Sequence, residues 1–169
     1  MFEFCYLRKE DLEKYAWDIV SILYDNMEKI VPKGNSIDFV LSHWLPVMQE
    51  ELRSETGKTI LIFKKDTREI VGYLRYKIRD DVYFIMDIQI KAAYQGKYQI
   101  FRKLYGFLLE QLGPDIAYVE AYVSKQNEKS LGVHGKLGLS IVGENLRGTS
   151  YHLRGTYSDL LKWYHRKED

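Results

Sequence analysis

The stretch "AAYQGKYQIFRKLYGFLLEQLGP" at residues 92–114 decides the fold of this chain. A tight turn, Gln95-Gly96-Lys97, leads directly into apolar residues at helical spacing, which predicts an amphipathic helix. The first N–H groups of a helix have no partner inside it, and the helix dipole adds about half a positive charge there. Because Gly96 allows close backbone approach and Lys97 adds a cation, the turn is a candidate pyrophosphate site. The alternative is an ordinary strand-to-helix turn with a solvated lysine.

Working outward, the flanking segments predict a mixed α/β chain with helices on both faces of the sheet. Apolar periodicity predicts helices near residues 10–30, 37–48, 100–112, 127–138 and 157–167, and strands near residues 2–7, 58–65, 69–78, 82–90, 116–123, 139–144 and 149–154. The short turns after the second and third strands predict an antiparallel meander. Ser36 is expected to cap the second helix, and Pro46 to kink or split it.

Length and composition bound the class of protein. A chain of 169 residues favours one domain, and the 46% apolar and 29% charged residues are ordinary for a globular protein. The net charge of +1 gives no general reason to expect nucleic acid or membrane as a partner. No membrane helix or signal peptide is expected, so a cytoplasmic location is predicted.

Several other chemistries lack support in the sequence. Cys5 is the only cysteine, and its apolar surroundings favour a small core residue over a nucleophile. His43, His152 and His165 are scattered and lack metal-ligand spacing, so no metal site is expected. The phosphate motifs G-x-x-x-x-G-K-[ST] and G-x-G-x-x-G are both absent.

A second segment narrows the alternatives. Residues 127–143 carry Asn127, Ser130, Lys136, Gly138 and Gly143. Together with the turn at residues 95–97, this segment resembles the motifs of the GCN5-related N-acetyltransferase (GNAT) family. The chain departs from the family pattern at Tyr98 and Ile100, where the family has small residues, and at Leu139, where it usually has phenylalanine. His134 stands where the family usually has a tyrosine that acts as general acid.

The resemblance implies a GNAT fold over residues 1–169, with a C-terminal helical extension at residues 157–169. It implies a central, mostly antiparallel sheet of six to seven strands, with helices on both faces and a splayed pair of strands 4 and 5. Acetyl-coenzyme A (acetyl-CoA) would be the co-substrate. The residues expected to contact it are Ile88, Gln89, Ile90, Gln95, Gly96, Lys97, Tyr98, Gln99, Ile100, Asn127 and Ser130.

The implied reaction is attack by a neutral primary amine on a thioester. An amine with a pKa of about 10.4 must first lose a proton, and Asp87 and Glu120 are the candidate bases. His134 is the candidate proton donor to the leaving thiolate, and Tyr122 or Tyr151 could donate instead. For each of these groups, a purely structural role is the alternative.

The acceptor is expected to be a small molecule or a peptide bearing an amine. By analogy with the family, Tyr24, Asp25, Glu28 and Trp44 are expected to line its site. The terminal segment is expected to pack on the domain, with a homodimer contact as the second option. A non-catalytic acyl-CoA-binding or protein-interaction domain that keeps the GNAT fold is the rival interpretation.

Overall fold

The computed structural model describes residues 1–166 and confirms the predicted mixed α/β class. Its helices and strands are β1 (Phe2–Tyr6), α1 (Leu12–Met27), α2 (Ile37–Ser54), β2 (Lys58–Lys64), β3 (Ile70–Arg79), β4 (Val82–Ile90), α3 (Ile100–Gln111), β5 (Tyr118–Ser124), α4 (Glu128–Lys136), β6 (Ser140–Glu144), β7 (Ser150–Thr156) and α5 (Tyr157–His165). Residues 167–169 of the predicted C-terminal extension lie outside the described residues.

The strands form one mostly antiparallel sheet of seven strands in the order β1-β2-β3-β4-β5-β7-β6. β4 and β5 form a parallel pair, in register from Val82 opposite Tyr118 to Ile85 opposite Ala121. Both strands continue beyond this ladder, β4 to Ile90 and β5 to Ser124. The later half of each strand therefore lies outside their pairing, as the predicted fold requires.

The chain forms two compact units. The first comprises Met1–Tyr76 and Asp87–Leu104, and the second comprises Lys77–Met86 and the described part of Tyr105–Asp169. The boundary falls inside β4, so the two halves of this strand belong to different units. Each unit is described on its own below.

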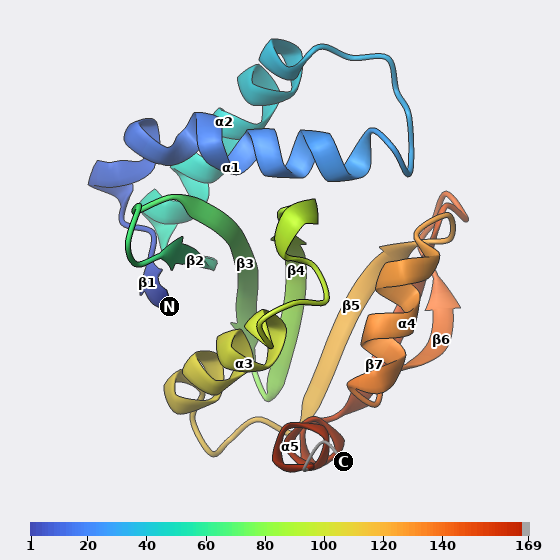
Figure 1. Cartoon of the computed structure of the whole chain (residues 1–169). Coiled ribbons are helices and arrows are strands. Elements are labelled where there is room, and N and C mark those ends of the chain that lie inside the picture. The colour runs from blue at the N-terminus through green and yellow to red at the C-terminus, as the bar shows by residue number, and fades with distance from the viewer. Residues whose placement is uncertain (167–169) are drawn as a thin grey trace. The chain divides into compact units, whose positions relative to one another are not determined.

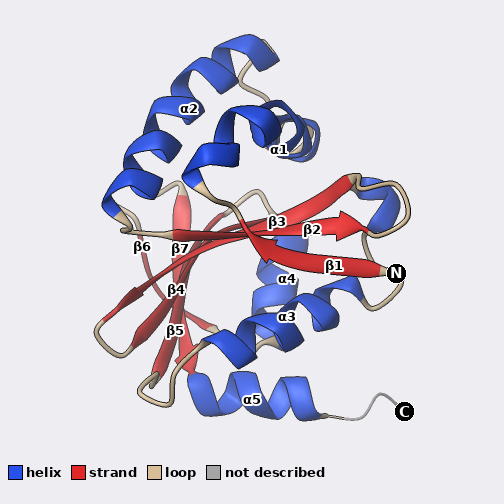
Figure 2. Cartoon of the chain, turned by 90° about the vertical axis from the view of Figure 1, so that its left-hand side faces the viewer, coloured by secondary structure: helices blue, strands red, loops and turns tan. Residues whose placement is uncertain are grey.

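In the first unit, α1 and α2 cover one face of β1, β2 and β3 (Figure 2). The apolar stripe predicted for α1 is buried because Leu12, Ile19 and Ile22 pack against strand residues such as Phe63 and Tyr73. Burial of one such side chain stabilises the fold by about 1.5–3 kcal/mol. The helical period of the sequence thus fixes which side of α1 meets the sheet.

The second helix confirms one local prediction and excludes one of the two effects predicted for Pro46. Ser36 Oγ accepts a hydrogen bond from the Phe39 N–H at 3.1 Å, which is the predicted N-cap. Pro46 does not split the helix, because α2 runs unbroken from Ile37 to Ser54. Trp44 and Met48, on either side of Pro46, are buried in the core that α2 shares with α1, and this burial offsets the backbone hydrogen bond that proline cannot make.

In the second unit, β5, β7 and β6 form an antiparallel ribbon, and α4 runs alongside β5 and β7 (Figure 1). Leu160 of α5 is fully buried, and Trp163 packs edge-on against Tyr105 of α3 at 5.5 Å between ring centroids. The terminal helix therefore packs on its own unit, as expected. None of the helices formed by residues 1–166 is long and apolar enough to cross a membrane.

Candidate functional site

The end of β4 presents part of its backbone away from β3. The Lys91 N–H donates to the Val71 carbonyl of β3 at 2.8 Å. Because backbone groups alternate in direction along a strand, the groups of Ile88 and Ile90 face away from β3, whereas those of Gln89 face it. The Ile90 carbonyl is already used, since it accepts from Asn26 Nδ2 at 2.9 Å and from Gln95 Nε2 at 2.7 Å.

The turn before α3 has an unusual backbone. Gly96, Tyr98 and Gln99 have φ values of 69°, 58° and 52°, in the left-handed region. That region costs a non-glycine residue about 1–2 kcal/mol, so two such residues in succession need compensation. Tyr98 obtains it by packing its ring against Phe2 and Tyr94, each at 6.1 Å between ring centroids.

The N–H groups of the turn fall into two sets. Those of Gln95, Lys97 and Ile100 donate to carbonyls within the turn at 3.3 Å. For the Gly96 and Tyr98 N–H groups, no protein acceptor is found among residues 1–166. At least three of the backbone N–H groups of residues 95–100, those of Gln95, Lys97 and Ile100, are therefore already used within the protein and do not point to a ligand as free donors.

There is room for an anion at this turn. A Cβ built on Gly96 would meet no atom within 4 Å. Ile100 is only 2% exposed, so its bulk lies in the core and not over the turn. Lys97 is exposed. Tyr98 and Ile100 are the two bulky residues that depart from the family pattern. The Tyr98 ring contacts Phe2 and Tyr94, and the Ile100 side chain is buried in the core.

A hydrogen-bonded chain of side chains runs along the same unit beside β4. The Tyr73 hydroxyl donates to Asp87 at 2.6 Å, and Gln89 Nε2 donates to Asp87 at 2.8 Å. Asn26 Nδ2 reaches Gln89 Oε1 at 3.0 Å, which links the chain to α1. Asp87 and Gln89 lie on one face of the strand, because side chains alternate along β4. The side chain of Gln89 is therefore committed to this chain of contacts.

The environment of Asp87 changes its acidity. Burial raises the pKa of the Asp87 carboxyl, and the hydrogen bonds from Tyr73 and Gln89 and the charge of Arg75 lower it in part. The pKa of Tyr73 lies well above its usual range, mainly because of its burial and secondly because of the Asp87 charge. Tyr73 therefore remains a hydrogen-bond donor, and the raised pKa brings Asp87 closer to the range useful for a general base.

In the second unit, Asn127, Ser130 and His134 are linked through α4. Asn127 Oδ1 accepts from the Ser130 N–H at 3.1 Å, so the N-x-x-S spacing forms the N-cap of this helix. His134 Nδ1 lies 2.7 Å from the Ser130 carbonyl and must carry a hydrogen to donate to it. Gly138 ends the segment with a φ of 95°, the expected left-handed position after a helix.

His134 lies in surroundings that disfavour a positive charge. It is 5% exposed, and burial lowers the pKa of its imidazole despite the bond to the Ser130 carbonyl. The ring is therefore neutral near pH 7, with its hydrogen on Nδ1 and a lone pair on Nε2. No partner for Nε2 is found among residues 1–166. A neutral ring of this tautomer is a hydrogen-bond acceptor at Nε2, which is the opposite of the donor role expected from the sequence.

A second group of polar side chains lies on β5 and β7. Glu120 Oε1 is 2.6 Å from His152 Nε2, and the His152 ring stacks on Tyr122 at 4.7 Å between centroids and 15° between planes. The contacts of His152 with Glu120 and Tyr122 could not be predicted from the sequence, because the β5–β7 register sets its position opposite Tyr122. In the sequence, α4 and β6 lie between β5 and β7, so no local sequence pattern predicts this register.

The residues expected around the acceptor do not gather at one place in the first unit. Trp44 belongs to the core under α1 and α2. Tyr24 donates to the Asn35 carbonyl at 2.8 Å, and Glu28 accepts from the Gly34 N–H at 3.1 Å. These two side chains hold the segment between α1 and α2, while Asp25 is exposed.

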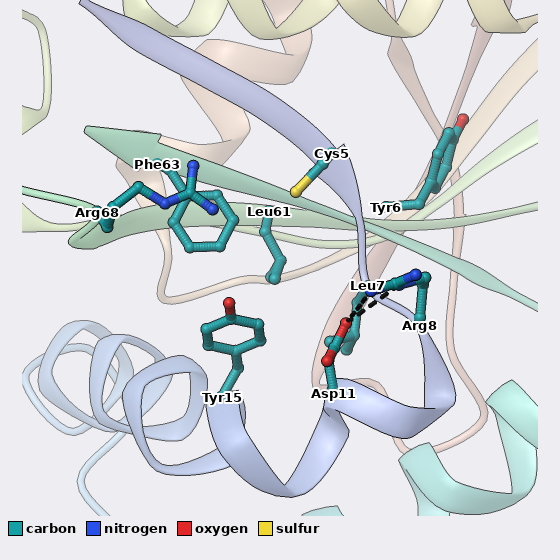
Figure 3. A pocket seen from close by; sticks show the side chains of 9 residues that line it. All are labelled: Cys5, Tyr6, Leu7, Arg8, Asp11, Tyr15, Leu61, Phe63 and Arg68. Atoms are coloured by element: carbon teal, nitrogen blue, oxygen red, sulfur yellow. Dashed lines mark hydrogen bonds and ion pairs between the residues drawn. The ribbon is translucent and has the colours of Figure 1, made fainter. Parts of the chain in front are cut away.

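The first unit also contains a cavity of about 400 Å³ beside β1 (Figure 3). Cys5 lies at its edge, and burial followed by the Glu3 charge raises the pKa of its thiol, so the thiolate is disfavoured. Both arginines that line the cavity are paired, Arg8 with Asp11 at 3.1 Å and Arg68 with Glu3 at 2.8 Å. Cys5 is half-buried there, in agreement with a packing role.

Comparisons with known proteins agree with this architecture. The model of the acetyltransferase (GNAT) family matches residues 18–139. The PaiA N-acetyltransferase of Thermoplasma acidophilum, solved with coenzyme A, shares 17% identity and a TM-score of 0.66, covering 93% of this chain and 99% of that one. PH1933 of Pyrococcus horikoshii shares 18% identity and a TM-score of 0.72, covering 92% and 98%.

A third structure is a spermidine N-acetyltransferase SpeG chimera from Vibrio cholerae and hSSAT, with 14% identity, a TM-score of 0.62 and coverage of 98% and 99%. At such identities these structures establish the fold. No curated protein sequence matches the chain. The family model covers more than half of the chain, and the strand order and the turn before α3 agree with it. The chain belongs to the acetyltransferase (GNAT) family.

Proposed function

We propose that this protein is an acetyl-CoA-dependent N-acetyltransferase that acetylates a primary amine by direct attack in a ternary complex. The observation that carries the proposal is the pairing, within one unit, of an outward-facing β4 backbone with the left-handed turn before α3. The first can bind an extended ligand as an added strand, and the second can bind an anion. Acetyl-CoA has both parts, an extended amide-bearing arm and a diphosphate, and supplies a thioester as the activated acetyl group.

In this proposal the turn binds the diphosphate through backbone donors. The N–H groups of Gly96 and Tyr98 are the primary donors, and the charge of Lys97 lies beside them. Gln95 acts indirectly, because its side chain fixes the turn to the Ile90 carbonyl. Ile100 begins α3, and the helix dipole adds to the favourable potential.

The strand end is proposed to bind the arm and polarise the acetyl carbonyl. Ile88 offers both backbone groups and Ile90 its N–H, whereas the Gln89 side chain holds Asp87 and Asn26 in place. One N–H aimed at a developing oxyanion stabilises the transition state by roughly 3 kcal/mol in other enzymes. In the second unit, Asn127 and Ser130, the two residues that the resemblance implies as coenzyme contacts, form the N-cap of α4, in which Asn127 Oδ1 accepts from the Ser130 N–H.

Proton transfer requires an acceptor for the amine proton and a donor for the leaving thiolate. Asp87 and Glu120 both remain candidates for the first role, Asp87 because burial raises its pKa. For the second role the neutral His134 is a poor donor, so Tyr122 or Tyr151 is the better choice. A rival function, acyl-CoA binding without transfer, is favoured by the same observation on His134.

Two measurements test the proposal. Isothermal titration should give saturable binding of acetyl-CoA to the wild type. A thiol-release assay with acetyl-CoA and a panel of amines should then give turnover with at least one of them. The panel contains spermidine, the compound in the name of one structural relative, lysine amide and a peptide with a free N-terminus. Binding without release on any amine would favour the rival function, and the absence of binding would overturn both.

A further inference from the structure

The last peptide group of β4, between Ile90 and Lys91, is held from three sides. Its N–H, which belongs to Lys91, donates to the Val71 carbonyl of β3 at 2.8 Å. Its carbonyl, which belongs to Ile90, accepts from Asn26 Nδ2 of α1 at 2.9 Å and from Gln95 Nε2 of the turn at 2.7 Å. A carbonyl oxygen has two lone pairs, so these two donors use its capacity as an acceptor. The peptide group therefore joins β3, α1 and the turn before α3.

The carboxamide of Asn26 donates both of its hydrogens within the first unit. One goes to the Ile90 carbonyl, and the other goes to Gln89 Oε1, which lies 3.0 Å from Asn26 Nδ2. An amide nitrogen carries two hydrogens, so these two bonds use all that the side chain can donate. Asn26 is half-buried in the last turn of α1, and its two acceptors belong to neighbouring residues of β4. Its side chain therefore connects the end of the helix to the end of the strand.

The bond to Gln89 also decides how the Gln89 amide is turned. Because Gln89 Oε1 accepts from Asn26, Gln89 Nε2 faces Asp87 and donates to its Oδ1 at 2.8 Å. The reversed amide would place two donors together at one end and an oxygen beside the carboxylate at the other. The Tyr73 hydroxyl donates to Asp87 Oδ2 at 2.6 Å, and the Arg75 charge also acts on this carboxyl. Asn26 therefore acts on Asp87, a candidate base, through the orientation of Gln89.

We infer that Asn26 is a positioning residue that fixes both the anion-binding turn and the candidate base Asp87. One of its hydrogens fixes the Ile90 carbonyl, to which Gln95 anchors the turn, and the other fixes the Gln89 amide, which holds Asp87. All of these residues belong to the first unit. The inference rests on the proposed function and deepens it, because it adds a residue of α1 whose role requires no contact with the coenzyme or the reacting atoms.

The effect on coenzyme binding follows from the order of these contacts. Two residues of the turn, Tyr98 and Gln99, have a left-handed backbone, so the turn needs support to keep its shape. Gln95 supplies part of this support from a carbonyl whose own orientation depends on Asn26. Without Asn26 the last peptide group of β4 is held less firmly, and the turn is less well preorganised for an anion. Affinity should then fall although no contact with the ligand is lost.

The test is titration calorimetry of coenzyme A with the full chain, with folding checked by urea unfolding of the same samples. Asn26→Ala should weaken binding by about 10-fold, the size expected for one hydrogen bond. Asn26→Asp keeps the shape of the side chain but removes both donated hydrogens, and it should weaken binding at least as much. Asn35→Ala and Asn35→Asp are the matched controls, because Asn35 is anchored through its backbone carbonyl, which both changes keep. Each control should bind within about twofold of wild type.

A double variant identifies the route from Asn26 to the turn. Gln95→Ala should weaken binding by about 10-fold as well. If Asn26 acts on the turn through the Ile90 carbonyl, its loss should matter little once Gln95 is gone. The variant with both Asn26→Ala and Gln95→Ala should therefore bind within about threefold of Gln95→Ala alone. A loss of about 100-fold, the product of the two single effects, would show that the two side chains act independently and would overturn the inference.

The pKa of Asp87 tests the second hydrogen of Asn26. The Gln89 hydrogen bond lowers the pKa of the Asp87 carboxyl, so Asn26→Ala, which frees the Gln89 amide, should raise that pKa. Carbon NMR of the carboxyl during a pH titration measures it. Gln95→Ala should leave this pKa unchanged while it weakens coenzyme A binding. An unchanged or lowered pKa in Asn26→Ala would overturn the assignment to Asp87.

The remaining outcomes separate this inference from the proposed function. A folded Asn26→Ala protein that binds coenzyme A within about threefold of wild type would overturn the inference and leave the proposed function intact. A wild type that binds no coenzyme A would overturn both. One measurement needs no variant: the side-chain amide hydrogens of Asn26 should exchange with solvent more slowly than those of Asn35 in NMR spectra of the wild type. Equal exchange rates would contradict the two bonds on which the inference depends.

Discussion

The turn before α3 and the Glu120–His152 face of β5 and β7 use different parts of the polypeptide. The turn relies on main-chain N–H groups, left-handed residues and a helix terminus, and the Tyr98 ring packs against Phe2. The β5–β7 face relies on side chains brought together by strand register. The first kind of site tolerates most changes of side chain, whereas the second depends on one particular pair. We therefore expect most side-chain substitutions in the turn to have small effects, and substitutions of the Glu120–His152 pair to have large ones.

The largest effect is expected at Gly96. Gly96→Glu places a carboxylate where the diphosphate is proposed to bind and forces a φ of 69° on a residue with a side chain. We expect coenzyme A affinity to fall by at least about 100-fold, or about 2.7 kcal/mol, in titration calorimetry. Gly113→Glu adds the same charge after α3, where a built Cβ also meets no atom within 4 Å, and should bind normally. Equal affinity in both variants would show that the anion site is elsewhere.

This division also explains how much the sequence could predict. Gly96 and the helical period after it indicated the turn, and the apolar periodicity indicated the helix near residues 127–138, because these features are local in the chain. That the helix continues through Pro46 could not be predicted, because burial of its neighbours Trp44 and Met48 is a tertiary effect. The contact of His152 with Glu120 was not predicted, because it depends on the register between β5 and β7, two strands that are neighbours in the sheet but are separated in the sequence by α4 and β6. The burial of His134 was not predicted, because burial cannot be inferred from one residue type.

The second prediction concerns how the stability of the protein depends on pH through Asp87. Burial raises the pKa of its carboxyl, so the folded protein keeps the proton to a higher pH than the unfolded chain, which titrates near 3.8. The stability that this group contributes is therefore complete below that pH and is lost as the pH rises through the folded pKa. Asp87→Asn, which stays neutral, should gain stability relative to the wild type between pH 4 and pH 7 in urea unfolding. Asp25→Asn, a change at an exposed carboxylate, is the control. A difference in unfolding free energy between Asp87→Asn and the wild type that stays constant from pH 4 to pH 7 would contradict the burial of a charge at Asp87.

His134 should show the reverse dependence. Burial lowers its pKa, so below the ordinary value of 6.5 the unfolded chain binds the proton first and the folded state loses stability as the pH falls. His134→Gln should therefore lose less stability than the wild type between pH 7.5 and pH 5.5, measured again by urea unfolding. The exposed His43→Gln serves as the comparison. If His134 were the charged proton donor, its removal would instead weaken the protein most at low pH.

The smallest effect is expected at Tyr98, whose side chain is proposed to pack and not to bind. Tyr98→Gly relieves a left-handed backbone worth about 1–2 kcal/mol but loses ring contacts worth about 0.5–1.5 kcal/mol each. The free energy of unfolding should stay within about 1 kcal/mol of wild type, and Tyr98→Ala, which keeps the backbone strain, should be less stable by about 1 kcal/mol. Coenzyme affinity should change by less than threefold in both, and a larger loss would show that the ring itself contacts the coenzyme.

The proposed anion site at the turn is tested most directly by a crystal structure of the protein with coenzyme A. We expect the diphosphate oxygens within about 3.1 Å of the backbone nitrogens of Gly96 and Tyr98, at the start of α3. A diphosphate bound at any other place, with these two N–H groups left to water, would contradict the site and the chemistry built on it.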